Sequence, residues 1–198
     1  MHKRVIEHFR LNDSILFAFI DKLEPMKLIK YDDYFVCLCR EIIGQQLAGK
    51  AADAIYRRFL KLFPKGSVTP KRTLKISDDK IRKIGLSWAK VTYIKDLAKK
   101  VFDGALNLRR LPSLSDDEVI KELVKVKGIG PWTAEMFLMF TLGREDIFSY
   151  GDLGLRKAIQ KLYGFKKEPT MRQMEKIVNT WKPYRTYAAR LLWKSLEK

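Results

Sequence analysis

The segment LVKVKGIGPWTA, residues 123–134, contains the pattern that decides the fold. It places Gly128 and Gly130 on either side of one apolar residue, between two stretches with helical periodicity. Pro131 suits the first position of the second helix, where a backbone N–H is not needed. We expect two helices joined by a short turn. Backbone amides at the start of the second helix then suit a phosphate oxygen, because glycine permits close approach and a helix N-terminus is positive. A G-x-G turn alone also fits an ordinary connection between two helices.

Helical periodicity continues on both sides of this segment, and strand-like alternation is rare. Ser115 with Glu118 and Thr170 with Gln173 have the spacing of capping boxes at helix starts. The sequence therefore predicts an all-α fold. The expected helices cover residues 14–23, 34–63 with a break near Gly44, 78–85, 87–104, 115–124, 131–142 and 152–164, and two more begin after Thr170 and at Pro183.

The charge of the chain indicates the kind of partner it binds. Its 198 residues include 40 Lys and Arg against 23 Asp and Glu, a net charge of +17. The excess lies in residues 57–110 (+12) and 156–198 (+9), whereas residues 111–155 carry −4. A basic excess of this size suggests a polyanion, most often nucleic acid. A lysine-rich solvated surface is the other interpretation.

Other features of composition exclude several classes of protein. The longest apolar runs, residues 15–20 and 136–142, are far shorter than the roughly 20 residues that span a bilayer. The N-terminus lacks the apolar region of a signal peptide. Cys37 and Cys39 are too few for a four-cysteine iron–sulfur cluster and would point to different sides of a helix. We therefore expect a soluble intracellular protein with no membrane contact, no iron–sulfur cluster and no required cofactor.

The full hairpin string resembles the helix-hairpin-helix (HhH-GPD) DNA glycosylase superfamily. Three more strings resemble signatures of the same family: REIIGQQ at 40–46, YGDL at 150–153 and WKPYRTYA at 181–188. Asp152 lies 20 residues after Trp132, a spacing that matches the family's 3-methyladenine DNA glycosylase II branch.

The resemblance extends over roughly residues 34–193 and implies an architecture. Two helical lobes are expected to flank a cleft, and the helix-hairpin-helix motif is expected to bind DNA. One lobe covers about residues 31–142, and the other combines about residues 1–30 with 143–198.

The resemblance also implies an activity, namely hydrolysis of the N-glycosidic bond of alkylated purines in duplex DNA for base excision repair. Lesions of the 3-methyladenine and 7-methylguanine type are implied. Asp152 would be catalytic, because a carboxylate stabilises an oxocarbenium-like sugar and orients or deprotonates the attacking water. Asp is also among the best helix N-caps, and one carboxylate can do both. Bifunctional members have a lysine nucleophile where this chain has Trp132, so we expect a monofunctional enzyme without lyase activity.

Members of this family stack the extruded base on aromatic side chains. Trp132 is the strongest candidate, because it follows the hairpin directly and an electron-rich ring attracts a cationic alkylated purine. Met136 and Phe140 would lie on the same helix face as Trp132, although core packing is the more frequent role of such a stripe. Tyr150 and Trp181 are weaker candidates for the base pocket.

Further residues are implied to contact DNA. Gln46 matches the residue that members insert into the minor groove to fill the gap left by a flipped nucleotide. An exposed polar residue near a helix start is the alternative interpretation of Gln46. In the hairpin, DNA contacts are expected from Lys127, Gly128, Gly130 and Thr133. The resemblance also implies that Na⁺ or K⁺ is held by the backbone carbonyls of Val124, Val126 and Ile129.

The expected partner is double-stranded DNA with a damaged base, bound by a monomer. The expected location is the nucleoid in the cytoplasm of a prokaryote or the nucleus of a eukaryote. Two other functions stay open: a glycosylase of the same superfamily for hypoxanthine, uracil or an oxidised purine, and a non-catalytic helix-hairpin-helix DNA-binding module. Asp152 at its expected spacing favours an enzyme.

Overall fold

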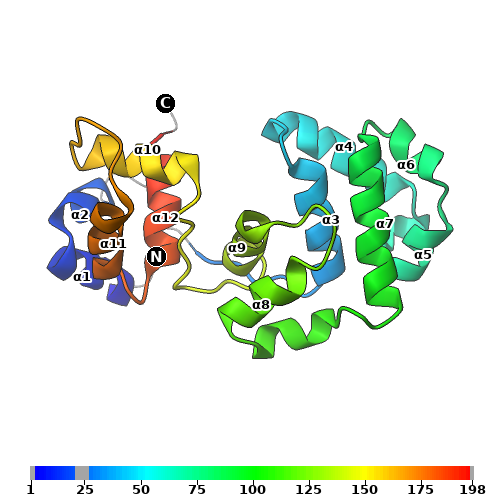
Figure 1. The fold of residues 1–198 in the computed structure, drawn as a ribbon, viewed down its shortest axis with the longest axis horizontal. Coiled ribbons are helices and arrows are strands. Elements are labelled where there is room, and N and C mark those ends of the chain that lie inside the picture. The colour runs from blue at the N-terminus through cyan, green and yellow to red at the C-terminus, as the bar shows by residue number, and fades with distance from the viewer. Residues whose placement is uncertain (1–2, 21–26, 197–198) are drawn as a thin grey trace. The chain divides into compact units, whose positions relative to one another are not determined.

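The computed structural model describes residues 3–20 and 27–196. Every regular element in these two ranges is a helix, as predicted (Figure 1). None of these helices is long and apolar enough to cross a membrane. The α-helices are α1 Lys3–Asn12, α2 Ser14–Ile20, α3 Tyr34–Gly44, α4 Gly49–Lys61, α5 Pro70–Lys75, α6 Asp78–Lys83, α7 Trp88–Phe102, α8 Asp116–Leu123, α9 Pro131–Phe140, α10 Leu153–Leu162, α11 Met171–Thr180 and α12 Arg185–Lys194, with 3₁₀ helices at Pro64–Gly66 and Leu108–Ser113.

Local capping signals predict most of the helix starts. Both capping boxes, at Ser115 and Thr170, form as expected. Pro131 occupies the first turn of α9, and α3 ends at Gly44. Each cap satisfies backbone N–H groups that have no partner inside the helix, a contribution of about 1 kcal/mol.

No helix was predicted for the segments of α1 and α5, and the start of the last helix differs from the prediction. The helix expected over 14–23 is described as far as Ile20, and its remaining residues lie outside the described ranges. The last helix does not begin at Pro183. Its first residue is Arg185, because Tyr184 is the N-cap and has non-helical backbone angles.

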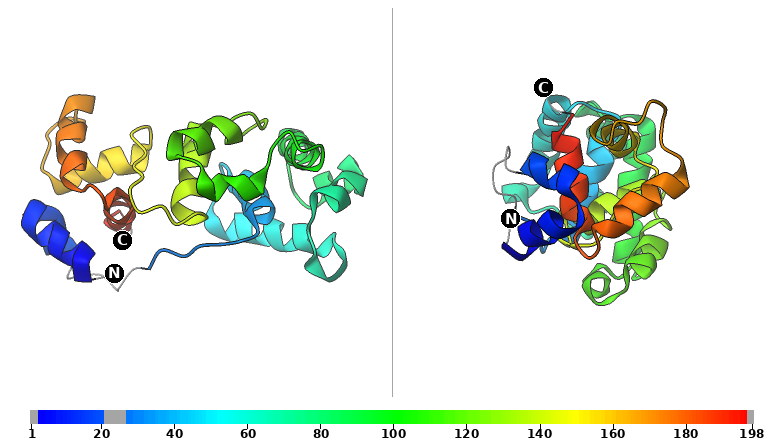
Figure 2. Two further views of the ribbon diagram at one scale, coloured as in Figure 1. Left: turned by 90° about the horizontal axis from the view of Figure 1, so that it is seen from below. Right: turned by 90° about the vertical axis from the view of Figure 1, so that its left-hand side faces the viewer.

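The chain divides into two compact units. We call Tyr31–Leu142 the hairpin unit, and Met1–Lys30 with Gly143–Lys198 the aspartate unit. In the hairpin unit, α7 packs against α3, α5 and α6, and α9 packs against α3 and α8 (Figure 1). In the aspartate unit, α12 packs against α2 and α10. The first and last segments of the chain therefore lie side by side, in blue and red in Figure 2.

Each unit has its own apolar core. In the hairpin unit, Ile42, Ile94 and Phe137 are fully buried, and in the aspartate unit Phe9 and Ile159 are fully buried. Burying one such side chain stabilises a fold by about 1.5–3 kcal/mol relative to leaving it exposed. These cores give rigid supports for the hairpin in one unit and for Asp152 in the other.

Candidate functional site

The two glycines of the hairpin have different structural requirements. Gly128 has φ +79°, and a Cβ there would lie 2.1 Å from the ring of Tyr93, so packing alone requires glycine. Gly130 has an ordinary φ of −94°, and no described atom beyond its two chain neighbours lies within 4 Å of the position of its Cβ. The fold does not itself need glycine at residue 130. The open space there suits close approach of a ligand's backbone or phosphate.

The start of α9 faces this open space. Gly130 is the N-cap and provides no side-chain hydrogen bond to the helix. The positive end of the helix dipole therefore has no side-chain acceptor from its cap, which is the arrangement that favours an anion. The open helix start at Gly130 suits a phosphate, and the DNA contacts expected at Gly128 and Gly130 stay predictions.

Asp96 of α7 holds the hairpin turn in place. Its Oδ2 accepts a hydrogen bond from the backbone N–H of Lys127 at 2.8 Å, and its Oδ1 pairs with Lys100 Nζ at 2.6 Å. Burial alone would raise the pKa of Asp96, but the bonds from Lys100 and Lys127 outweigh it and lower that pKa. The side chain of Lys127 is exposed, as a contact to DNA requires.

The three carbonyls expected to hold a monovalent cation are not equivalent. Val126 O accepts a hydrogen bond from Ile129 N at 3.1 Å. In the described ranges, no protein donor bonds to the carbonyls of Val124 and Ile129. Carbonyl oxygens suit hard cations, so Val124 and Ile129 fit the expected site better than Val126 does. The cation itself stays a prediction.

Gln45 connects α3 with the hairpin, a role that the sequence did not reveal. Its Nε2 donates to Gly128 O at 2.8 Å and to Thr133 Oγ1 at 3.3 Å. Thr133 is buried, so its hydroxyl is used inside the hairpin unit. If Thr133 contacts DNA, its backbone N–H near the start of α9 is the suitable group.

Gln46 follows in a left-handed conformation with φ +57°, which residues other than glycine seldom adopt. Gln46 and Trp132 line one hollow of about 440 Å³ in the hairpin unit, together with Glu41 and Gln45. Trp132 keeps 44% of its surface exposed. The structure thus brings together Gln46 and Trp132, two residues for which separate roles were predicted.

Glu41 is a titratable group in this hollow that the sequence did not single out. Burial raises the pKa of its carboxyl, and the neighbouring Arg40 opposes that shift. Arg40 itself pairs with Asp53 at 3.2 Å. Glu41 is therefore easier to protonate than an ordinary glutamate.

In the aspartate unit, Asp152 caps α10 as predicted. Its Oδ1 accepts a hydrogen bond from Leu155 N at 2.7 Å and another from Trp193 Nε1 at 3.1 Å. A Cβ on Gly154 would lie 3.0 Å from that Oδ1 and 3.3 Å from the Trp193 ring. Glycine at residue 154 therefore lets Trp193 approach, and the carboxylate is oriented by both α10 and α12.

Trp193 is a residue that the sequence prediction missed. It is separated from Asp152 by 41 residues along the chain, and its hydrogen bond forms because α12 packs against α10. No local spacing relates the two residues. The only available signal was a tryptophan on the last predicted helix.

The remaining base-pocket candidates differ in accessibility. Trp181 is fully buried, and its Nε1 donates to Asp13 Oδ2 at 2.7 Å, so it belongs to the core and offers no face to a base. That corrects its assignment to the pocket. Met136 is 4% exposed, in agreement with a core role. Phe140 and Tyr150 are half-buried and stay candidates.

Comparison with known proteins identifies the family. The family model for HhH-GPD superfamily base excision DNA repair proteins matches residues 39–183. DNA-3-methyladenine glycosylase 1 of Schizosaccharomyces pombe is 32% identical over 182 residues, which are 91% of this chain and 80% of that protein.

Two solved structures are similar at a TM-score of 0.86. One is a DNA-3-methyladenine glycosidase from Bacillus halodurans, 36% identical and covering 98% of this chain and 89% of its own. The other is the 3-methyladenine DNA glycosylase of Schizosaccharomyces pombe in complex with abasic DNA. It is 30% identical, and the match covers 99% of this chain and 98% of that chain. With the hairpin, its glycines and the capped aspartate in place, the chain belongs to the HhH-GPD superfamily of base excision DNA repair proteins.

Proposed function

We propose that this chain is a monofunctional DNA glycosylase that hydrolyses the N-glycosidic bond of alkylated purines in duplex DNA. The observation that supports it most is Asp152, whose Oδ1 is held at 2.7 Å by Leu155 N and at 3.1 Å by Trp193 Nε1. A carboxylate in a fixed orientation stabilises positive charge that develops on a sugar. The similarity to 3-methyladenine glycosylases over nearly the full chain supports the same conclusion.

The reaction needs an electrophilic sugar, a leaving base and a water molecule. The bond between C1′ and the purine nitrogen breaks, and both electrons leave with the base. An alkylated purine that carries positive charge becomes neutral in this step, so it needs no general acid. The water oxygen bonds to C1′, and its proton passes to the Asp152 carboxylate or to solvent. The products are the free base and an abasic site.

DNA recognition is assigned to the hairpin unit. The start of α9 binds a backbone phosphate at Gly130, and Gln46 fills the gap left by the flipped nucleotide. The exposed ring of Trp132 stacks on the cationic base. Such an enzyme acts on chromosomal DNA, which places it in the nucleoid or the nucleus.

One observation favours a second substrate class. Glu41 lines the hollow beside Trp132, and burial raises the pKa of its carboxyl. A protonated carboxyl can donate a proton to a neutral leaving base such as hypoxanthine, which departs poorly as an anion. Under this alternative, Glu41→Gln abolishes release of hypoxanthine and leaves release of 7-methylguanine unchanged.

Incubation with methylated duplex DNA tests the proposed activity. We expect release of 3-methyladenine or 7-methylguanine, measured by chromatography of the free bases, with abasic sites left in the strand. Because water attacks and residue 132 is a tryptophan, borohydride should trap no covalent complex with DNA. Binding to the DNA without release of any base would favour a non-catalytic module, and a trapped adduct would contradict the monofunctional mechanism.

A further inference from the structure

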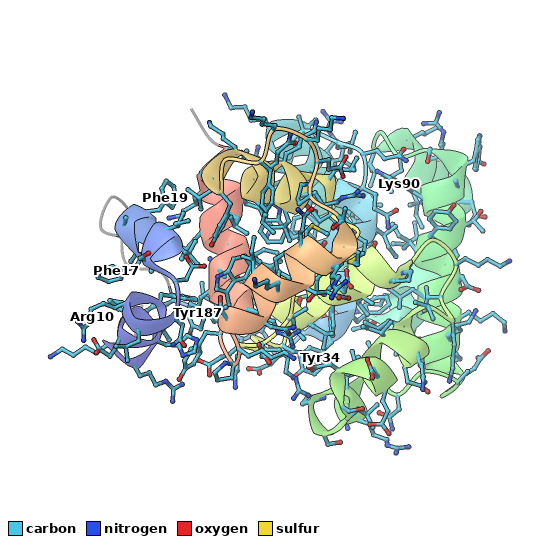
Figure 3. All side chains as sticks on the ribbon, turned by 60° about the vertical axis from the view of Figure 1, so that its left-hand side comes forward. Arg10, Phe17, Phe19, Tyr34, Lys90 and Tyr187 are labelled. Atoms are coloured by element: carbon cyan, nitrogen blue, oxygen red, sulfur yellow. The ribbon has the colours of Figure 1, made fainter. Side chains whose placement is uncertain are left out.

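Lys90 forms contacts that play no part in the chemistry or the DNA contacts assigned above. It lies in the first turn of α7, and its Nζ donates to Ile43 O at 2.8 Å and to Gln45 O at 2.5 Å. The side chain, labelled in Figure 3, therefore bridges α7 and α3. Both carbonyls belong to the C-terminal end of α3, where the helix leaves carbonyls without partners of its own. Lys90 thus caps α3 from a different helix.

The electrostatics of α7 alone do not explain a lysine at this position. A cation in the first turn of α7 meets the positive end of that helix's dipole, which is unfavourable. The same ammonium lies at the negative C-terminal end of α3, where a cation is favourable. Burial lowers the pKa of Lys90, and no carboxylate in the described ranges pairs with it. The two carbonyls of α3 are therefore its partners.

The residue that follows these carbonyls is Gln46, with φ +57°. A non-glycine residue stays in this region only when its surroundings hold it there. Two contacts hold the preceding residue, Gln45. Lys90 of α7 donates to the Gln45 carbonyl, and the Gln45 side chain donates to Gly128 O in the hairpin at 2.8 Å. The turn that contains Gln46 is thus attached on two sides.

We propose that Lys90 is a positioning residue that keeps Gln46 in the conformation needed for insertion into DNA, and so sets the preference for a duplex substrate. This inference rests on the proposed function, because Gln46 has a gap to fill only when a nucleotide is flipped. Without Lys90, the Gln45 carbonyl is released and Gln46 relaxes. Hydrolysis of an unpaired base is spared, because the hydrogen bonds of Lys90 go to the carbonyls of Ile43 and Gln45 and not to Asp152 or Trp132.

Lys95 provides a matched control on the same helix. Its Nζ donates to Leu74 O at 3.1 Å and to Ile76 O at 2.5 Å, at the end of α5. It also pairs with Asp78 at 3.3 Å. Lys95→Met therefore removes a lysine of α7 that caps the end of α5, and it leaves the turn at Gln46 intact.

The experiment compares release of 7-methylguanine from single-stranded and duplex DNA of the same sequence. Lys90→Met should lower the duplex rate about 10-fold and change the single-strand rate less than 2-fold. Lys95→Met should leave the ratio of the two rates unchanged. In a Gln46→Gly background, Lys90→Met should have no further effect on the ratio, because contacts that act through one residue are not additive. Fluorescence of 2-aminopurine beside the lesion should report less flipping.

An unchanged duplex-to-single-strand ratio in Lys90→Met, or the same loss in Lys95→Met, would overturn the role of Lys90. If Lys90→Met does not fold, Lys90→Gln replaces it, because the shorter amide stays polar beside the α3 carbonyls but cannot reach both. The duplex-to-single-strand ratio of release rates for Lys90→Gln then tests the role of Lys90 by the same criterion. Failure of the proposed function is a separate outcome, since the unaltered protein would then release no base from either DNA.

Discussion

Asp152→Asn should keep the folded protein but lower base release by roughly 10²- to 10³-fold, the usual effect of removing one group that stabilises transition-state charge. Asparagine caps a helix as well as aspartate does, and its Oδ1 can accept the same bonds from Leu155 N and Trp193 Nε1. Only the negative charge and the proton acceptor are lost. The measurement is single-turnover release of 7-methylguanine together with the thermal midpoint of unfolding.

Two further variants separate charge from geometry. Asp152→Ala also removes the cap of α10, so it should lose about 1 kcal/mol of stability in addition to activity. Trp193→Phe keeps a ring beside Asp152 but removes the 3.1 Å hydrogen bond, so release should fall less than in Asp152→Asn. Normal base release by Asp152→Asn would exclude Asp152 as the catalytic group.

Alanine at the two hairpin glycines should affect different properties, and Gly128→Ala should be the more damaging to the fold. A Cβ there lies 2.1 Å from the Tyr93 ring at a φ of +79°, so strain and overpacking together should cost about 2–4 kcal/mol. Because Gln45 binds the Gly128 carbonyl, the contact between α3 and the hairpin should weaken as well. Chemical denaturation measures the loss.

Gly130→Ala should change stability by about 1 kcal/mol or less, because no described atom lies near its Cβ and only the preference for glycine over alanine at an N-cap is lost. Its affinity for DNA should fall roughly 10- to 100-fold, because the added Cβ keeps the phosphate away from the backbone amide, and one hydrogen bond to a charged group is worth about 1.5–3 kcal/mol. Fluorescence anisotropy with a duplex that contains an abasic site measures this. Equal affinity of Gly130→Ala and the unaltered protein would show that no phosphate approaches residue 130.

Local chemistry explains what could be predicted from the sequence. Helix starts depend on hydrogen bonds between residues three apart, so the caps at Ser115, Asp152 and Thr170 were readable. Hydrophobic periodicity indicated an all-α chain, and the motif at residues 123–134 indicated the family. All of these signals act over a few neighbouring residues, and they agree with the structure.

Burial and long-range hydrogen bonds could not be predicted in the same way. Trp181 is an aromatic residue of the kind that stacks on bases. Its hydrogen-bond partner Asp13 is 168 residues away in the chain, and the two residues form part of a core. Trp193 reaches Asp152 across 41 residues, and Lys90 reaches the end of α3 across 45. Each contact depends on which helices pack together, which no local pattern specifies.

The family, the hairpin and the candidate aspartate can be identified from the amino-acid sequence, because each belongs to a motif of contiguous residues whose spacing is set by covalent geometry. The supports of the site were decided only by tertiary structure. Gln45 and Lys90 hold the turn of Gln46, and Trp193 orients Asp152, through helices that meet because their apolar faces are buried together.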